Sequence, residues 1–98
     1  MNRLKNKVVI VTGPSRGLGR AIALGCAHNG ARVILAGLEP ERLKTLQGEI
    51  SAAGGESLDI PCDVSSPGDI ENLVRNTLER FQRIDGLVNN AGVNFVKP

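Results

Sequence analysis

Three glycines near the start of the chain have a spacing that could hold a phosphate group. Gly13, Gly17 and Gly19 follow an apolar run of mostly β-branched residues, 8–12, and precede a segment with helical periodicity. A strand, a glycine turn and a helix N-terminus in that order gather unpaired backbone N–H groups, and the helix dipole favours an anion there. We expect Gly13 to allow a backbone turn, Gly17 to allow close approach of a pyrophosphate, and Gly19 to allow close helix packing.

The spacing of this turn separates it from two better-known phosphate loops. It is Gly-x-x-x-Gly-x-Gly, whereas the commonest dinucleotide fingerprint is Gly-x-Gly-x-x-Gly. Gly19 is followed by Arg20-Ala21, so the Lys and Ser/Thr of a P-loop are missing. Taken alone, the glycines are also compatible with a turn that only reverses the chain.

Strand-like and helix-like segments alternate along the chain. In the first helix, we expect Leu18, Ile22 and Cys26 to form the buried stripe and Gly25 to allow close packing. Ser66 is expected to cap the third helix.

The alternation predicts an α/β fold in one partial domain, residues 1–98, with a parallel sheet of about four strands and three helices covering both faces. The strands are expected at 8–12, 31–36, 57–62 and 86–90, and the helices at 17–29, from 40 to about 53, and 67–81.

The four expected strands end in small or polar residues. Ligands of such sheets bind in a crevice outside the carboxyl ends of the strands, so this agreement favours a ligand site over ordinary loops. The four ends are Thr12-Gly13, Ala36-Gly37-Leu38, Cys62-Asp63-Val64 and Asn89-Asn90-Ala91-Gly92.

The composition argues against several other functions. The formal net charge is +2 without a basic run, and there are two aromatic residues, so we expect no nucleic-acid partner. Apolar runs are too short for a membrane span, and the start lacks the apolar segment of a secretory signal, so we expect no membrane partner and a cytoplasmic location. With two distant cysteines, Cys26 and Cys62, and one histidine, we expect no metal site, and both thiols are interpreted as buried.

The chain resembles the amino-terminal half of a short-chain dehydrogenase/reductase. Three motifs carry the resemblance: residues 12–19 match Thr-Gly-x-x-x-Gly-x-Gly, Asp63-Val64 matches the Asp-Val pair after the third strand, and residues 89–92 match Asn-Asn-Ala-Gly. The resemblance implies a Rossmann-type fold and NAD(P) binding. A methyltransferase on the same kind of sheet would not need the last motif.

The resemblance also implies roles for individual residues. Asp63 would accept a hydrogen bond from the adenine amino group, with Val64 against the ring, and Thr12 would tie the first strand to residues 89–92. Residues of the glycine turn would surround the pyrophosphate and the adenosine ribose, and those of the last motif would line the floor near the riboses. The implied cofactor-binding residues are Gly13, Ser15, Arg16, Gly17, Leu18, Gly19, Gly37, Leu38, Asp63, Val64, Asn90, Ala91 and Gly92.

The end of the second strand bears on the choice of cofactor. A site for NAD places a carboxylate there to bind the ribose 2′-OH, and this chain has Gly37 instead. Arg16 could pair with a 2′-phosphate. Glu39 could replace the missing carboxylate, and Leu38 stands where many NADP-dependent relatives carry a second basic residue. We therefore expect NADP, with NAD as the alternative.

The family's catalytic groups are missing from these residues. The resemblance implies a Tyr that transfers a proton, a Lys four residues later and a Ser that holds the carbonyl, but the chain has no tyrosine. We therefore expect no catalytic residue here, and no activity of the 98 residues alone. One interpretation is a truncated piece of an oxidoreductase that transfers hydride between NADP(H) and a carbonyl or alcohol substrate, as a homo-oligomer. The others are a non-catalytic nucleotide-binding or interaction module, and a nonfunctional fragment. In the truncated piece, the fourth strand would be an exposed edge that promotes self-association.

Overall fold

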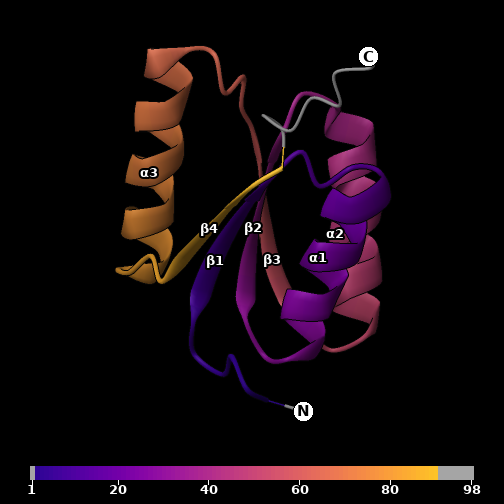
Figure 1. Cartoon of the computed structure of the whole chain (residues 1–98). Coiled ribbons are helices and arrows are strands. Elements are labelled where there is room, and N and C mark those ends of the chain that lie inside the picture. Colours follow the sequence, from indigo (N-terminus) through magenta and orange to yellow (C-terminus); the bar gives the residue numbers. More distant parts are fainter. Residues whose placement is uncertain (1, 91–98) are drawn as a thin grey trace, which may run out of the picture.

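The computed structural model describes residues 2–90 as one parallel sheet with helices on both faces. The strand order is β3-β2-β1-β4, and every pairing is parallel (Figure 1). This confirms the predicted α/β architecture. The elements are β1 (Val8–Thr12), α1 (Gly17–His28), β2 (Arg32–Gly37), α2 (Pro40–Ala52), β3 (Glu56–Pro61), α3 (Pro67–Phe81) and β4 (Gly86–Asn89).

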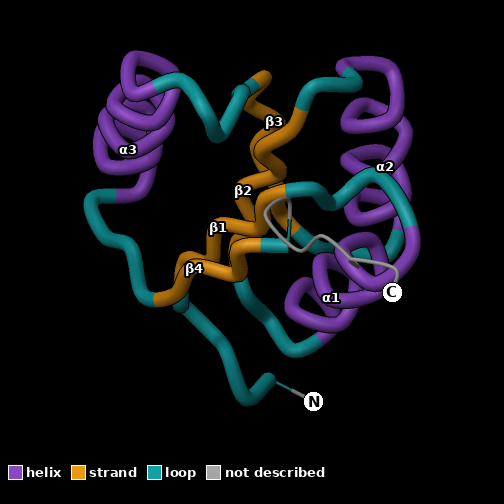
Figure 2. Tube along the Cα trace, turned by 45° about the horizontal axis from the view of Figure 1, so that its top comes forward, coloured by secondary structure: helices purple, strands orange, loops and turns teal. Residues whose placement is uncertain are grey.

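Two hydrophobic clusters hold the layers together. Figure 2 shows α1 and α2 on one face of the sheet and α3 on the other. All five residues of β1 are buried, and they alternate between the faces: Val9 and Val11 pack with the first two helices, whereas Val8 and Ile10 pack with Leu73 and Phe81 on the α3 face. A strand buried on both faces explains the unbroken apolar run in the sequence.

The predicted packing of α1 is partly wrong. Gly19 and Ala23 are the fully buried residues of this helix, whereas Leu18 is 63% exposed. Gly25 is exposed, and a Cβ added there would meet no other atom within 4 Å. The helix approaches the sheet so closely at Gly19 that its buried stripe is turned by one residue from the predicted one. Ile22 and Cys26 stay partly buried beside that stripe.

The helix α3 begins as the sequence predicts. Ser66 Oγ accepts a hydrogen bond from the Asp69 backbone N–H (3.3 Å), and Pro67 is the first helical residue. Asp69 differs from a capping box because its Oδ2 accepts from the backbone N–H of Asp63 (2.8 Å) rather than from Ser66. This bond fixes the first turn of α3 to the carboxyl end of β3.

The strands β2 and β3 differ from the prediction by one residue. β2 begins at Arg32 and extends to Gly37, and β3 ends at Pro61, so Cys62 follows the strand. The Cys62 N–H still donates to the Gly37 carbonyl (2.9 Å), which holds these two strand ends together.

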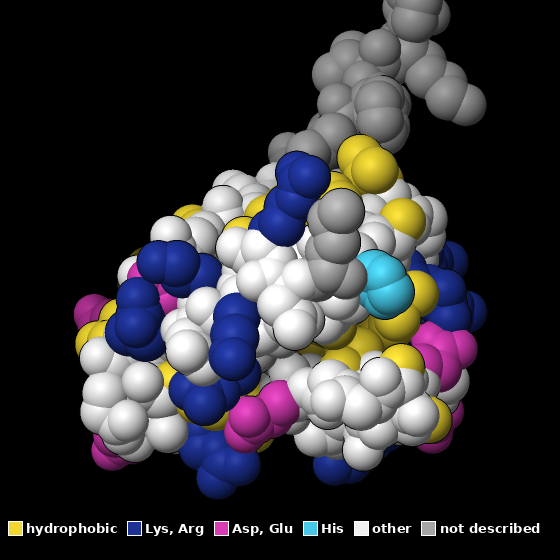
Figure 3. Space-filling view, turned by 90° about the horizontal axis from the view of Figure 1, so that it is seen from below, with side chains coloured by type: hydrophobic (Ala, Val, Ile, Leu, Met, Phe, Trp, Pro, Cys, Tyr) yellow, Lys and Arg dark blue, Asp and Glu magenta, His cyan; other side chains and the backbone are white. Residues whose placement is uncertain are grey.

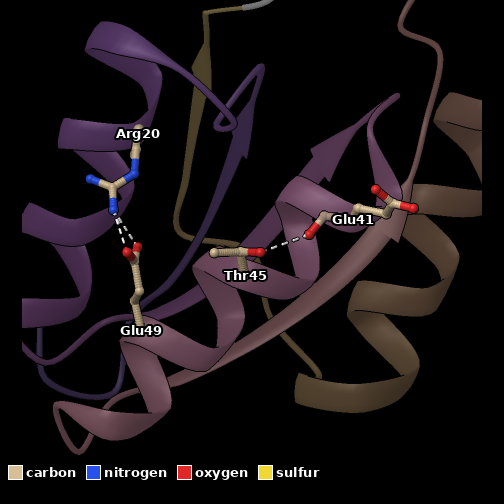
Figure 4. A network of polar contacts seen from close by, with 4 residues as sticks. All are labelled: Arg20, Glu41, Thr45 and Glu49. Carbon is tan, nitrogen blue, oxygen red and sulfur yellow. Dashed lines mark hydrogen bonds and ion pairs between the residues drawn. The ribbon is translucent and has the colours of Figure 1, made fainter.

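Side chains also bridge α1 and α2, the two helices on the face of the sheet opposite α3. Arg20 of α1 donates to both carboxylate oxygens of Glu49 of α2, as Figure 4 shows. Within residues 2–90, no helix is long and apolar enough to cross a membrane.

Candidate functional site

The carboxyl ends of all four strands border one cavity of about 350 Å³. Residues that the sequence places far apart meet there, as expected for a parallel sheet with helices on both faces. The lining residues are Gly13, Ser15, Arg16, Ala36, Gly37, Leu38, Glu39, Cys62, Asp63, Val64 and Asn90.

The glycine turn has a backbone shape that requires glycine at two positions. Gly13 has φ +63° and Gly17 has φ +53°, in the left-handed region that penalises a Cβ. The Gly13 N–H donates to the Ala36 carbonyl (3.1 Å), which ties the turn to the end of β2. The prediction for Gly13 is confirmed. At Gly17 the surroundings are open, because an added Cβ would meet no atom within 4 Å.

The third glycine is surrounded by backbone and by a residue from the far end of the chain. A Cβ on Gly19 would lie 2.0 Å from the Gly13 carbonyl oxygen and 2.5 Å from Asn90 Nδ2. Asn90 Nδ2 donates to the same Gly13 oxygen (3.0 Å). In addition, Thr12 Oγ1 donates to Asn89 Oδ1 (3.0 Å). The expected tie between Thr12 and the segment that begins at Asn89 is thus present, and together with the bond from Asn90 it holds the turn in place.

Among the described residues, the N-terminus of α1 has neither a capping side chain nor an acidic one in its first turn. Arg16 occupies the capping position with extended backbone and makes no side-chain capping bond, and the first turn of the helix has no acidic residue. Its first N–H groups therefore lack a capping side chain, and the positive end of the helix dipole meets no carboxylate within this turn. The turn and the helix together offer what a phosphate needs.

Asp63 carries a negative charge at the end of β3. Its Oδ1 accepts hydrogen bonds from Ser65 Oγ (2.6 Å) and from the Ser65 backbone N–H (2.9 Å). These two bonds lower the pKa of the Asp63 carboxyl below its ordinary value. Two exposed apolar side chains, Val64 and Leu38, line the same cavity as this carboxylate. A flat group with an N–H donor would suit this combination.

Three charged side chains meet beside the end of β2. Glu39 Oε2 accepts from Arg16 Nη2 (2.9 Å) and from Arg42 Nε (3.1 Å). The sequence motifs indicate separate roles for Arg16 and Glu39 and none for Arg42. The sequence did contain a signal, because Pro40 begins α2 and so places Arg42 one turn after Glu39, within reach of it.

The described cysteines are poor nucleophiles. Burial raises the pKa of the Cys62 thiol, and the nearby carboxylates of Asp69 and Asp63 raise it further. Burial also raises the pKa of the half-buried Cys26 thiol. Residues 2–90 contain no cluster of three or more His, Cys, Asp or Glu residues that could hold a metal ion.

A larger hollow, of about 710 Å³, lies at the opposite, amino end of the sheet. Figure 3 shows this face, where the single histidine, His28, lies beside apolar side chains. The last turns of α1 and α2 border the hollow, so it faces helix carbonyl groups rather than N–H groups. Its Arg32 is already paired with Glu56 (3.3 Å). The smaller cavity is therefore the better candidate for an anionic ligand.

Most of the predicted site residues are brought together, and some are not. Gly17, Leu18 and Gly19 form the first turn of α1 beside the cavity but do not line it. Ala91 and Gly92 lie outside the described residues. The predicted residues that do line the cavity are Gly13, Ser15, Arg16, Gly37, Leu38, Asp63, Val64 and Asn90.

Comparison with known proteins assigns the family. The family model for short chain dehydrogenases matches residues 7–98, which is nearly the whole chain. This chain belongs to the short-chain dehydrogenase family. The resemblance expected from the three motifs is thereby confirmed.

Similar proteins include a 3-oxoacyl-[acyl-carrier-protein] reductase of Synechocystis, 38% identical over 95% of this chain and 38% of that protein. An L-rhamnose 1-dehydrogenase (NAD(P)(+)) of Azotobacter vinelandii is 44% identical over 92% of this chain and 37% of that protein. The chain thus spans less than two fifths of the length of these relatives.

Comparison with solved structures agrees with this family assignment. A metagenomic short-chain oxidoreductase in complex with NADP has a TM-score of 0.87 and 44% identity, covering 92% of this chain and 41% of that one. A hydroxysteroid dehydrogenase from Escherichia coli has a TM-score of 0.91 and 32% identity, covering 98% of this chain and 41% of that one. The described fold is therefore the amino-terminal, NAD(P)-binding part of such enzymes.

Proposed function

We propose that this chain binds the adenosine half of NADP(H) and forms the cofactor-binding part of an oxidoreductase that acts on a carbonyl or alcohol substrate. The observation that carries the proposal is the single cavity where the glycine turn, the open N-terminus of α1 and Asp63 meet. When bound, the nicotinamide ring supplies the hydride-transfer chemistry. The residues described here would bind and orient the other end of the cofactor.

Each part of the cavity has a matching part of the cofactor. The turn between Gly13 and Gly17 and the first N–H groups of α1 would hold the pyrophosphate. Asp63 would accept a hydrogen bond from the adenine amino group, with Leu38 and Val64 against the ring faces. The side chain of Asn90 is already used to hold Gly13, so its contribution would be to shape the turn.

NADP is preferred over NAD in this proposal because of Arg16. Its side chain is 66% exposed and borders the cavity, where a 2′-phosphate would find a guanidinium, and Gly37 brings no carboxylate to repel it. A hydrogen bond to a charged group contributes about 1.5–3 kcal/mol. The metagenomic relative in complex with NADP agrees with this choice, whereas the rhamnose dehydrogenase is named for both cofactors. Glu39 opposes the preference, since its carboxylate is paired with Arg16.

Calorimetric titration of the 98-residue chain tests the proposal. We expect 2′,5′-ADP to bind more tightly than 5′-AMP, and NADPH to bind more tightly than NADH. Asp63→Asn is expected to weaken all four ligands, whereas Arg16→Ala should weaken only the two with a 2′-phosphate. Equal binding of 2′,5′-ADP and 5′-AMP would refute the preference for NADP, and binding of neither would favour a nonfunctional fragment.

The catalytic step is outside the proposal for this chain. The 98 residues include no tyrosine, so the proton-transferring Tyr-x-x-x-Lys of the family is not among them. We expect this chain to bind nucleotide without reducing any carbonyl compound in an NADPH oxidation assay. A non-catalytic nucleotide-binding module would behave in the same way.

A further inference from the structure

Two guanidinium groups share one carboxylate oxygen beside the end of β2. Glu39 Oε2 accepts from Arg16 Nη2 (2.9 Å) and from Arg42 Nε (3.1 Å). Because both nitrogens lie within hydrogen-bond distance of the same oxygen, they are at most about 6 Å apart. Two positive charges thus lie close together and face a single negative charge.

The two guanidinium groups come from the amino ends of neighbouring helices. Arg16 is the residue before α1, and Arg42 lies in the first turn of α2. These helices lie side by side on one face of the sheet (Figure 2). The first turn of α2 also contains Glu41, whose carboxylate already complements the helix dipole. The side chains, rather than the dipole, therefore make this corner attractive to a further anion.

Arg42 is less fully neutralised than Lys44, the other cation of α2. Lys44 Nζ lies 3.5 Å from Asp59 Oδ2, and among the described residues no other cation pairs with that carboxylate. Arg42, by contrast, shares the Glu39 carboxylate with Arg16. Its guanidinium group can consequently accept a second anionic partner.

A phosphate monoester matches two guanidinium groups better than one carboxylate does. It carries a charge of about −1.5 to −2 at pH 7 and has three acceptor oxygens, so it can bind both cations at once. The planar fork of guanidinium N–H groups suits these oxygens. Gly37 and Leu38, which border the cavity at this end of β2, bring no charge of their own.

We propose that Arg42 is a specificity-determining residue, which binds the 2′-phosphate of NADP(H) together with Arg16 in exchange for Glu39. The inference rests on the proposed function, which assigns this phosphate to Arg16 alone. In the structure Glu39, and not Arg42, borders the cavity. The phosphate replaces the Glu39 carboxylate between the two guanidinium groups. A nucleotide without the 2′-phosphate leaves Glu39 in place and makes no contact with Arg42.

Calorimetric titration of the 98-residue chain with 2′,5′-ADP and 5′-AMP tests this role. Arg42→Ala is expected to weaken 2′,5′-ADP about tenfold, because a hydrogen bond between charged groups is lost. The Kd for 5′-AMP should change less than twofold. Lys44→Ala is the matched control, since it removes the same charge two residues further along α2, and it should change neither Kd more than twofold.

A double variant separates phosphate binding from a role in holding Glu39. If Arg42 binds the phosphate, Arg42→Ala should still weaken 2′,5′-ADP about tenfold when it is combined with Glu39→Gln. If Arg42 only holds the Glu39 carboxylate, the same substitution should have no effect in that background. The second result would overturn the inference.

The wild type shows whether the proposed function itself has failed. Equal Kd values for 2′,5′-ADP and 5′-AMP would refute the preference for NADP, and this inference with it. A wild-type preference that Arg42→Ala leaves unchanged, or that Lys44→Ala reduces as much, would refute the inference alone. If Arg42→Ala does not fold, Arg42→Lys decides. It keeps the charge but not the fork, so 2′,5′-ADP should bind at least twofold more weakly, and unchanged binding would contradict a direct contact.

Discussion

Replacing Glu39 with glutamine should make the chain bind a 2′-phosphate more tightly. In the structure, Glu39 Oε2 pairs with both Arg16 (2.9 Å) and Arg42 (3.1 Å), so the carboxylate lies beside two guanidinium groups, where the proposed function would place a phosphate oxygen. A bound 2′-phosphate would have to displace it and would then lie close to its negative charge. The glutamine variant removes both the competition and the repulsion while keeping the side-chain size.

The expected size of the effect follows from the exposure of these groups. The side chains of Arg16, Glu39 and Arg42 are 66%, 42% and 52% exposed, so each ion pair contributes about 0.2–1 kcal/mol. Repulsion between two unit charges 4 Å apart costs about 1 kcal/mol in water. The two ion pairs and the repulsion together give about 1.4–3 kcal/mol, or roughly a 10- to 150-fold tighter Kd for 2′,5′-ADP. The Kd for 5′-AMP should change less than twofold.

The assay is calorimetric titration of both ligands at low and high salt, where screening should reduce the gain. Glu41→Gln is the matched control. It makes the same charge change in the first turn of the same helix, where the backbone carbonyl of Glu41 accepts from Thr45 Oγ1 (3.0 Å; Figure 4). An equal gain from both variants would mean that only net charge matters. A gain that is the same for 2′,5′-ADP and 5′-AMP would refute the assignment of this corner to the 2′-phosphate.

Two further predictions concern stability. Gly19→Ala should destabilise the chain by about 1–3 kcal/mol in urea unfolding, because its Cβ would overlap the Gly13 carbonyl, whereas Gly25→Ala, in open space, should stabilise it by up to about 1 kcal/mol. Equal effects would contradict the close packing of α1. The hydrogen bonds from Arg83 lower the pKa of the Asp85 carboxyl in the folded state. The ionised carboxylate therefore stabilises the fold fully above the pKa that Asp85 has in the unfolded chain, and this stabilisation is lost as the pH falls through the lower pKa of the folded state. Asp85→Asn should therefore flatten the fall of the urea midpoint between about pH 5 and 3. An unchanged slope would refute this role.

The elements were predictable because local pattern and tertiary environment agree in most of the chain. The buried run of β1, the Ser66 cap of α3 and the glycine turn each have a local physical cause that a sequence displays. The buried face of α1 was not predictable in detail. Periodicity favours the large side chain of Leu18, whereas a backbone contact at Gly19, which has no side chain to signal it, decides the orientation.

In the candidate site, too, some features follow from the sequence and the topology, whereas others depend on three-dimensional contacts. Placing strand ends at one edge of the sheet needs only the parallel topology, so the meeting of Gly37, Asp63 and Asn90 could be predicted. The use of the Asn90 amide to hold Gly13 could not, because it depends on a three-dimensional contact between residues 77 positions apart. The pairing of Glu39 with two arginines also depends on where the turn after β1 lies relative to α2.

The bond between Asn90 and Gly13 has a consequence for the order of events during synthesis. The glycine turn leaves the ribosome early, yet the amide that fixes its carbonyl is made 77 residues later. Closing so long a loop is slow compared with forming the local turn, because it must await the chain and the assembly of β4 beside β1. Until its ninetieth residue emerges, a nascent chain therefore has a glycine turn that the Asn90 amide does not yet hold in place. Nucleotide present in the cell has no finished site to engage before that moment.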